Sequence, residues 1–171
     1  MKKILTLGVI LFSLLSSSLQ AEDNMSITDI KGKSYKIVGT EEGLKVKGLE
    51  GKIVFLEFFG HRCPPCIKSI PHLINLQNKY KDKLAIIAVE VQGLGNNQLK
   101  KFAAKKGINY IVASDEKTKG LIDYISNRAQ WQGSIPFMLA MDKTGKVQFA
   151  QAGMIPESSL EKLINQLDTL K

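Results

Sequence analysis

The sequence predicts an α/β fold in which a central mixed β-sheet is flanked by helices on both faces and preceded by an N-terminal β-hairpin. Two apolar runs, Ile53–Phe59 (IVFLEFF) and residues 84–91 (LAIIAVEV), are typical of strands that are covered on both faces. A segment with helical character follows each run, and strands that alternate with helices indicate parallel crossovers. Two later strands joined by a short turn add an antiparallel pair, so the sheet should be mixed.

The N-terminal segment reads MKKILTLGVILFSLLSSSLQA. Two lysines, an apolar run and a small residue follow one another in the order of a secretory signal peptide. We therefore expect a signal peptide over residues 1–21, cleaved after about Ala21 or retained as a membrane anchor. Residues 22–171 then form one domain in the periplasm, where a thiol pair is a disulfide or is kept reduced by a dedicated partner.

The formal net charge is +8, but the lysines are scattered among acidic residues and form no basic run of five. This pattern favours a solvated surface over a site for nucleic acid. Nothing in the sequence predicts an oligomer, and we expect a monomer.

The first part of the domain should contain the hairpin and the first central strand. Residues 25–38 predict two short strands around Lys31-Gly32-Lys33. Residues 39–52 carry four glycines and are expected to form a loop before the strand Ile53–Phe59. A helix should follow the cysteines, and Pro71 should kink it.

The second part alternates strands and helices before it ends in a hairpin and a helix. Asn96 or Asn97 could cap the first of these helices, and Gly107 should end it. The expected elements are a strand at 84–91, a helix at 97–106, a strand at 110–113, a helix at 117–126, strands at Phe137–Met141 and 147–151 joined by a turn at 142–145, and a helix at 158–170.

The chain contains only two cysteines, Cys63 and Cys66, within the stretch HRCPPCIKSIP. A c-type haem site needs a histidine directly after the second cysteine, and this position is Ile67. A zinc site needs three or four ligands, but a helix would place His72 about 9 Å along its axis from Cys66. We therefore predict no metal site, and disulfide exchange remains.

The position of the pair favours exchange chemistry. Cys63 should lie where a buried strand ends and a helix begins, and there the unpaired N–H groups and the helix dipole favour a thiolate. Pro64 suits the first helical position because it has no N–H to lose, and Pro65 stiffens the turn. Cys66 lies one turn further on and can close a ring with Cys63.

With these residues in view, the chain resembles thioredoxin-fold proteins, and more narrowly the exported reductases of the TlpA/ResA/CcmG type. The resemblance rests on VFLEFFGHRCPPC, on Pro71, and on GSIPF followed by DKTGK. It implies a thioredoxin-like domain over residues 22–171 and a cis-proline loop at Ile135 and Pro136. In this family the proline sits against the cysteine pair, and the preceding residue offers its backbone to the client. The protein would then need no cofactor, because the disulfide Cys63–Cys66 is itself redox-active.

The resemblance also implies a buried acid beside the thiols, and Glu57 occupies that position. Burial would raise its pKa and let it take a proton from Cys66, although a carboxylate satisfied by a lysine or by water is the alternative. Two positions depart from many relatives. Arg62 replaces a tryptophan, and either stabilises the Cys63 thiolate or is a surface residue. Ser69 replaces a glutamate.

Two further residues are candidates for the site. Trp131 lies in the segment NRAQWQGS, which is longer than usual, and either forms a rim for substrate or packs in the core. His61 either donates to the thiolate or faces solvent.

The predicted function is thiol:disulfide exchange with client proteins. Cys63 attacks a client disulfide and Cys66 resolves the mixed disulfide, while a membrane electron donor of the CcdA/DsbD kind, implied by the resemblance, reduces the enzyme again. The clients could be apocytochrome c thiols before haem attachment or a copper-site protein. Two alternatives stay open: a DsbA-like disulfide donor, which Arg62 favours, and a non-catalytic copper chaperone, whose third ligand would have to be His61 or a methionine.

Overall fold

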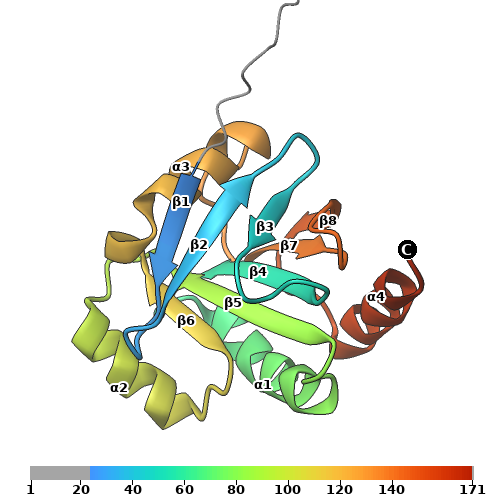
Figure 1. Cartoon of the computed structure of the whole chain (residues 1–171). Helices are drawn as coiled ribbons and strands as arrows, with labels where there is room; N and C mark the ends of the chain where they lie inside the picture. The colour runs from blue at the N-terminus through green and yellow to red at the C-terminus, as the bar shows by residue number, and fades with distance from the viewer. Residues whose placement is uncertain (1–23, 171) are drawn as a thin grey trace, which may run out of the picture.

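The computed structural model describes residues 24–170, so the predicted signal peptide lies outside the described residues. The chain forms a five-stranded sheet with the order β6-β5-β4-β7-β8 and a separate three-stranded sheet with the order β1-β2-β3 (Figure 1).

The five-stranded sheet is built around β4 (Ile53–Phe59). This strand pairs parallel with β5 (Leu84–Glu90) and antiparallel with β7 (Phe137–Met141). β6 (Ile111–Ser114) extends the parallel side, and β8 (Val147–Ala152) extends the antiparallel side. Every residue of β4 and β5 is buried, as expected for strands covered on both faces. The predicted mixed sheet is therefore confirmed.

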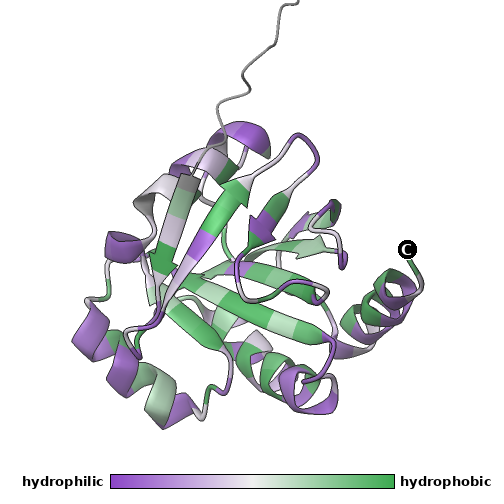
Figure 2. Cartoon of the chain, viewed as in Figure 1, coloured by the Kyte–Doolittle hydropathy of each residue, from purple (hydrophilic) through white to green (hydrophobic). Residues whose placement is uncertain are grey.

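Helices cover both faces of this sheet. α1 (Pro64–Lys79), α2 (Asn96–Lys106) and α4 (Glu157–Thr169) contribute Leu73, Leu99 and Ile164 to one hydrophobic core. α3 (Lys119–Arg128) and the three-stranded sheet contribute to a second core on the opposite face. Figure 2 shows the apolar residues concentrated in the strands of the sheet, while polar residues dominate the outer sides of the helices.

The N-terminal region departs from the prediction in one element. β1 (Asn24–Thr28) and β2 (Ser34–Gly39) form the expected hairpin. The segment predicted as a loop, 39–52, contains a third strand, β3 (Leu44–Val46), which pairs with β2. The strand depends on a close backbone approach, because the Leu44 N–H donates to the Gly145 carbonyl at 2.9 Å and a Cβ on Gly43 would collide with that carbonyl oxygen. Three residues are too few to reveal such a strand by periodicity.

Some helix boundaries also differ from the expected ones. α1 is a single helix that contains Pro71, and the kink expected there stays a prediction. α2 starts at Asn96 after Gly95, so neither Asn96 nor Asn97 is its N-cap, whereas Gly107 ends it with a positive φ of 68° as predicted. The helix predicted at 117–126 is divided into a short 3-10 turn η1 (Asp115–Lys117) and α3. Thr118 separates the two, because its hydroxyl bonds to the Ser114 carbonyl at 2.9 Å.

Within residues 24–170, no helix combines the length and the apolar character needed to cross a bilayer.

Candidate active site

Cys63 and Cys66 form a disulfide at the start of α1, with their Cα atoms 5.2 Å apart. Cys63 is the N-cap residue, with extended backbone, and Pro64 and Pro65 are the first two helical residues. Both cysteines are largely buried, with 6% and 1% of their surface exposed. The predicted placement of Cys63 at a helix N-terminus is therefore confirmed.

The two prolines determine which backbone group meets the Cys63 sulfur. Neither has an N–H, so the first donor available along α1 is the N–H of Cys66, which lies 3.3 Å from Cys63 Sγ. This N–H and the positive end of the helix dipole would stabilise a negative charge on Cys63 once the disulfide opens. Pro64 and Pro65 are themselves exposed, so they border the sulfur pair on the surface.

Glu57 lies on β4 and is 2% exposed. Burial raises its pKa to about 8, although the hydrogen bond from Ser69 acts in the opposite direction. The Ser69 hydroxyl is 3.2 Å from Glu57 Oε1 and 2.8 Å from the Cys66 carbonyl oxygen. Ser69 therefore links the acid to the backbone of the second cysteine. A carboxyl with this pKa can both accept and donate a proton near neutral pH.

The peptide bond between Ile135 and Pro136 is cis, as the resemblance implied. Pro136 is buried directly before β7, and its carbonyl accepts the Gly153 N–H at 2.7 Å. Ile135 is partly buried and packs against the core cluster that contains both cysteines. The expected loop is therefore present beside the same core.

Trp131 packs in the core, which is one of the two positions that the sequence left open. Only 8% of it is exposed, and its indole packs on Phe58 and Phe137 with ring centroids 4.6 and 5.6 Å away. It belongs to the core on the face opposite the cysteine cluster, and its Nε1 donates to the Ser134 carbonyl at 2.7 Å. Burial of a large aromatic surface with a satisfied N–H explains this position.

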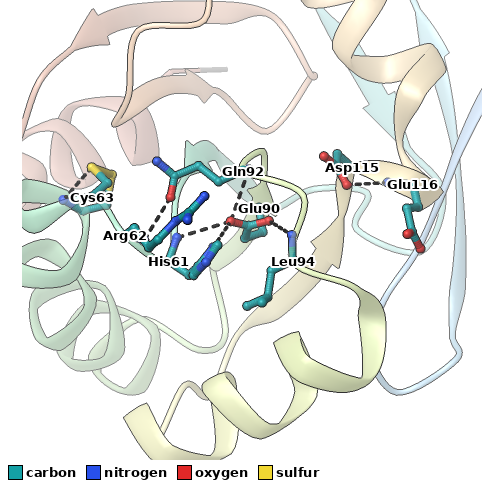
Figure 3. A network of polar contacts seen from close by, with 9 residues as sticks. His61, Arg62, Cys63, Glu90, Gln92, Leu94, Asp115 and Glu116 are labelled. Carbon is teal, nitrogen blue, oxygen red and sulfur yellow. Dashed lines mark hydrogen bonds and ion pairs between the residues drawn. A yellow bond between two sulfur atoms is a disulfide. The ribbon is translucent and has the colours of Figure 1, made fainter.

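His61 is held by Glu90, the last residue of β5, and Arg62 by Gln92 in the loop that follows (Figure 3). His61 Nδ1 lies 2.8 Å from Glu90 Oε1, so the ring is paired with a carboxylate. Arg62 is exposed, and its backbone N–H donates to Gln92 Oε1 at 2.9 Å. Sequence reasoning did not identify Glu90 or Gln92. The signal for Glu90 was available, because an acid at the end of an apolar strand is as unusual as Glu57 in its own strand.

Among the residues that the structure describes, no group of three or more histidine, cysteine, aspartate or glutamate side chains is placed to hold a metal ion.

Sequence comparisons match most of this chain to known proteins. Residues 24–150 match the AhpC/TSA family. Thiol-disulfide oxidoreductase ResA of Bacillus anthracis is 31% identical over 145 residues, which are 84% of this chain and 75% of that protein. Protein DipZ of Mycobacterium bovis is 31% identical over 154 residues, but these cover only 21% of DipZ and 86% of this chain.

Solved structures support the fold. A thiol:disulfide interchange protein of the thioredoxin family from Chlorobium tepidum superimposes with a TM-score of 0.66 at 20% identity, over 84% of this chain and 92% of that one. StoA from Bacillus subtilis gives a TM-score of 0.61 at 15% identity, over 81% and 94% of the two chains.

Proposed function

The chain belongs to the AhpC/TSA family and to the TlpA/ResA/CcmG-like group of thiol:disulfide oxidoreductases, and from that membership we propose that it reduces protein disulfides outside the cytoplasmic membrane. The observation that carries the proposal is the buried Cys63–Cys66 pair at the N-terminus of α1, with an acid of raised pKa, Glu57, linked to Cys66 through Ser69. The exchange activity follows from the family. Its direction, its compartment and its clients are our proposals.

In the first step the Cys63 thiolate attacks one sulfur of a client disulfide. A bond forms between Cys63 Sγ and that sulfur, and the other client sulfur leaves as a thiolate that takes a proton from solvent. Cys63 is suited to this attack because the Cys66 N–H and the helix N-terminus stabilise its thiolate.

In the second step Cys66 resolves the mixed disulfide. Its thiol gives a proton to the Glu57 carboxylate, and the resulting thiolate attacks Cys63 Sγ. The second client thiolate leaves and is protonated. The client has then gained two electrons and two protons, and the enzyme holds the Cys63–Cys66 disulfide. Because burial raises the pKa of Glu57 to about 8, its carboxylate is a stronger base than that of an exposed glutamate and suits this proton transfer.

The group to which the chain belongs supports a reductant and an exported location. We propose that a membrane electron donor of the CcdA/DsbD kind returns two electrons to the disulfide after each cycle. We propose apocytochrome c, with the cysteines of its haem motif oxidised, as the first client class to test. Neither donor nor client needs a cofactor on this chain, because the electron pair is carried by the two sulfurs.

The experiment uses a Cys66→Ala variant expressed in the natural host. Without the resolving thiol, the mixed disulfide between Cys63 and its client should persist and can be isolated under acid quench. Cys63→Ala is the matched control and should trap nothing. In parallel, thiol labelling of the wild-type protein should find the pair mainly as dithiol. A pair found mainly as disulfide in the cell would show that the protein donates disulfides instead.

A further inference from the structure

The turn that presents Cys63 is held by side chains from another part of the fold (Figure 3). Glu90, the last residue of β5, lies opposite Phe59 in the sheet and is fully buried. Its carboxylate accepts the backbone N–H of His61 at 3.2 Å and faces His61 Nδ1 at 2.8 Å. It also accepts the backbone N–H groups of Gln92 at 3.2 Å and Leu94 at 2.9 Å.

The backbone partners are all N–H donors, and the two carboxylate oxygens of Glu90 together accept from each of them. Glu90 therefore ties the β4–α1 turn to the loop that follows β5.

Gln92 makes the next contact toward the cysteine. Its Oε1 accepts the Arg62 N–H at 2.9 Å, and its side chain lies against Gly60, where a Cβ would collide with it. The Cys63 N–H then donates to the Gly60 carbonyl at 3.3 Å. Each of the three successive N–H groups at residues 61, 62 and 63 therefore has an acceptor, and two of these acceptors are side chains from the end of β5 and the loop that follows it.

We propose that Glu90 and Gln92 are positioning residues for thiol–disulfide exchange, which hold residues 60–63 so that Cys63 Sγ stays at the N-terminus of α1 when the disulfide is open. The proposal rests on the exchange chemistry assigned above and not on its direction.

The two redox states depend on this network to different degrees. In the oxidised protein the bond to Cys66 also fixes the Cys63 sulfur. In the reduced protein that bond is absent, and the turn is held by its hydrogen bonds to Glu90 and Gln92 and by the bond from the Cys63 N–H to the Gly60 carbonyl. Loss of these bonds should therefore destabilise the dithiol, and the Cys63 thiolate in particular, more than the disulfide.

The test compares Gln92→Met with Gln98→Met. The first removes the acceptor for the Arg62 N–H at similar side-chain length, and the second is a matched control at an exposed position on α2. The oxidised domain is equilibrated with glutathione buffers, and the Cys63 thiol pKa is followed by thiolate absorbance. Gln92→Met should shift the glutathione equilibrium toward the disulfide by up to about tenfold, the limit reached if only the dithiol loses the free energy of one hydrogen bond. The thiol pKa should rise, and the Arg62 amide should exchange its hydrogen faster.

Glu90→Gln keeps the size of the side chain but places an amide NH₂ among N–H donors, so its shift should exceed that of Gln92→Met. If Glu90→Gln fails to fold, the result for Gln92→Met alone tests the positioning role of these residues. An unchanged glutathione equilibrium and an unchanged Cys63 pKa in Gln92→Met would overturn the proposal, even if the variant melts earlier. The wild-type potential tests the direction of exchange separately, because this inference concerns only differences from wild type.

Discussion

Replacing Glu57 by glutamine removes the one ionisable group at this position and keeps the side chain about the same size. In the folded protein burial raises the pKa of Glu57 from 4.5 to about 8. Between these two values the folded state holds a proton that the unfolded state has released, so the stability of the wild type falls as pH rises. The stability is fully present below pH 4.5 and is lost progressively up to about pH 8.

The size of the effect follows from the gap between the two pKa values. Each pH unit corresponds to about 1.4 kcal/mol, so the whole interval corresponds to about 5 kcal/mol, a large part of the stability of an ordinary domain. The stability of Glu57→Gln relative to wild type should therefore increase by about this amount between pH 4 and pH 9.

The assay is denaturant unfolding of the oxidised protein across that pH range, because the disulfide removes both thiols from the titration. The difference between variant and wild type isolates Glu57 from every other group that titrates in common. A difference that stays constant from pH 5 to pH 8 would refute the reasoning. Glu57 would then ionise as it does in the unfolded chain, and its role as the proton acceptor for Cys66 would lose its basis.

Three further changes test other parts of the site. Ser69→Ala removes a hydrogen bond that lowers the pKa of Glu57, so the pH profile of client reduction should move to higher pH. An unmoved pH profile would contradict the link between Ser69 and Glu57. Trp131→Ala should lower the free energy of unfolding by about 3–5 kcal/mol, because the indole is part of the core. The reduction potential of the cysteine pair should stay unchanged, and a changed potential would contradict this placement of Trp131. Cys66→Ala should accumulate mixed disulfides on non-reducing gels, whereas accumulation on Cys63→Ala would reverse the assigned roles.

Local patterns explain what the sequence could predict about the site. Cys63, Cys66 and the two prolines lie within four residues, so the helix start and the sulfur pair follow from neighbouring positions alone. Glu57 is recognisable because an acid within an apolar strand needs a reason to be buried. The cis peptide bond at Pro136 could be expected only from the family resemblance.

The features that escaped prediction depend on contacts between distant residues. His61 and Glu90 are 29 residues apart in the sequence, and no periodicity links them. Trp131 stands among polar residues, so the sequence left a rim and a core position both open, and only the sheet brings Phe58 and Phe137 against it. β3 forms because residues 43–44 contact Gly145, which is distant in the sequence. A three-residue segment carries no pattern that predicts such a contact.

The reduction potential of the Cys63–Cys66 pair tests the proposed direction of exchange most directly. It would be measured on the purified domain by equilibration with glutathione buffers of known composition. The account predicts a potential near that of thioredoxin, about −270 mV, which suits a protein that passes electrons to client disulfides. A potential near about −120 mV, as in DsbA, would contradict it and make the protein a donor of disulfides.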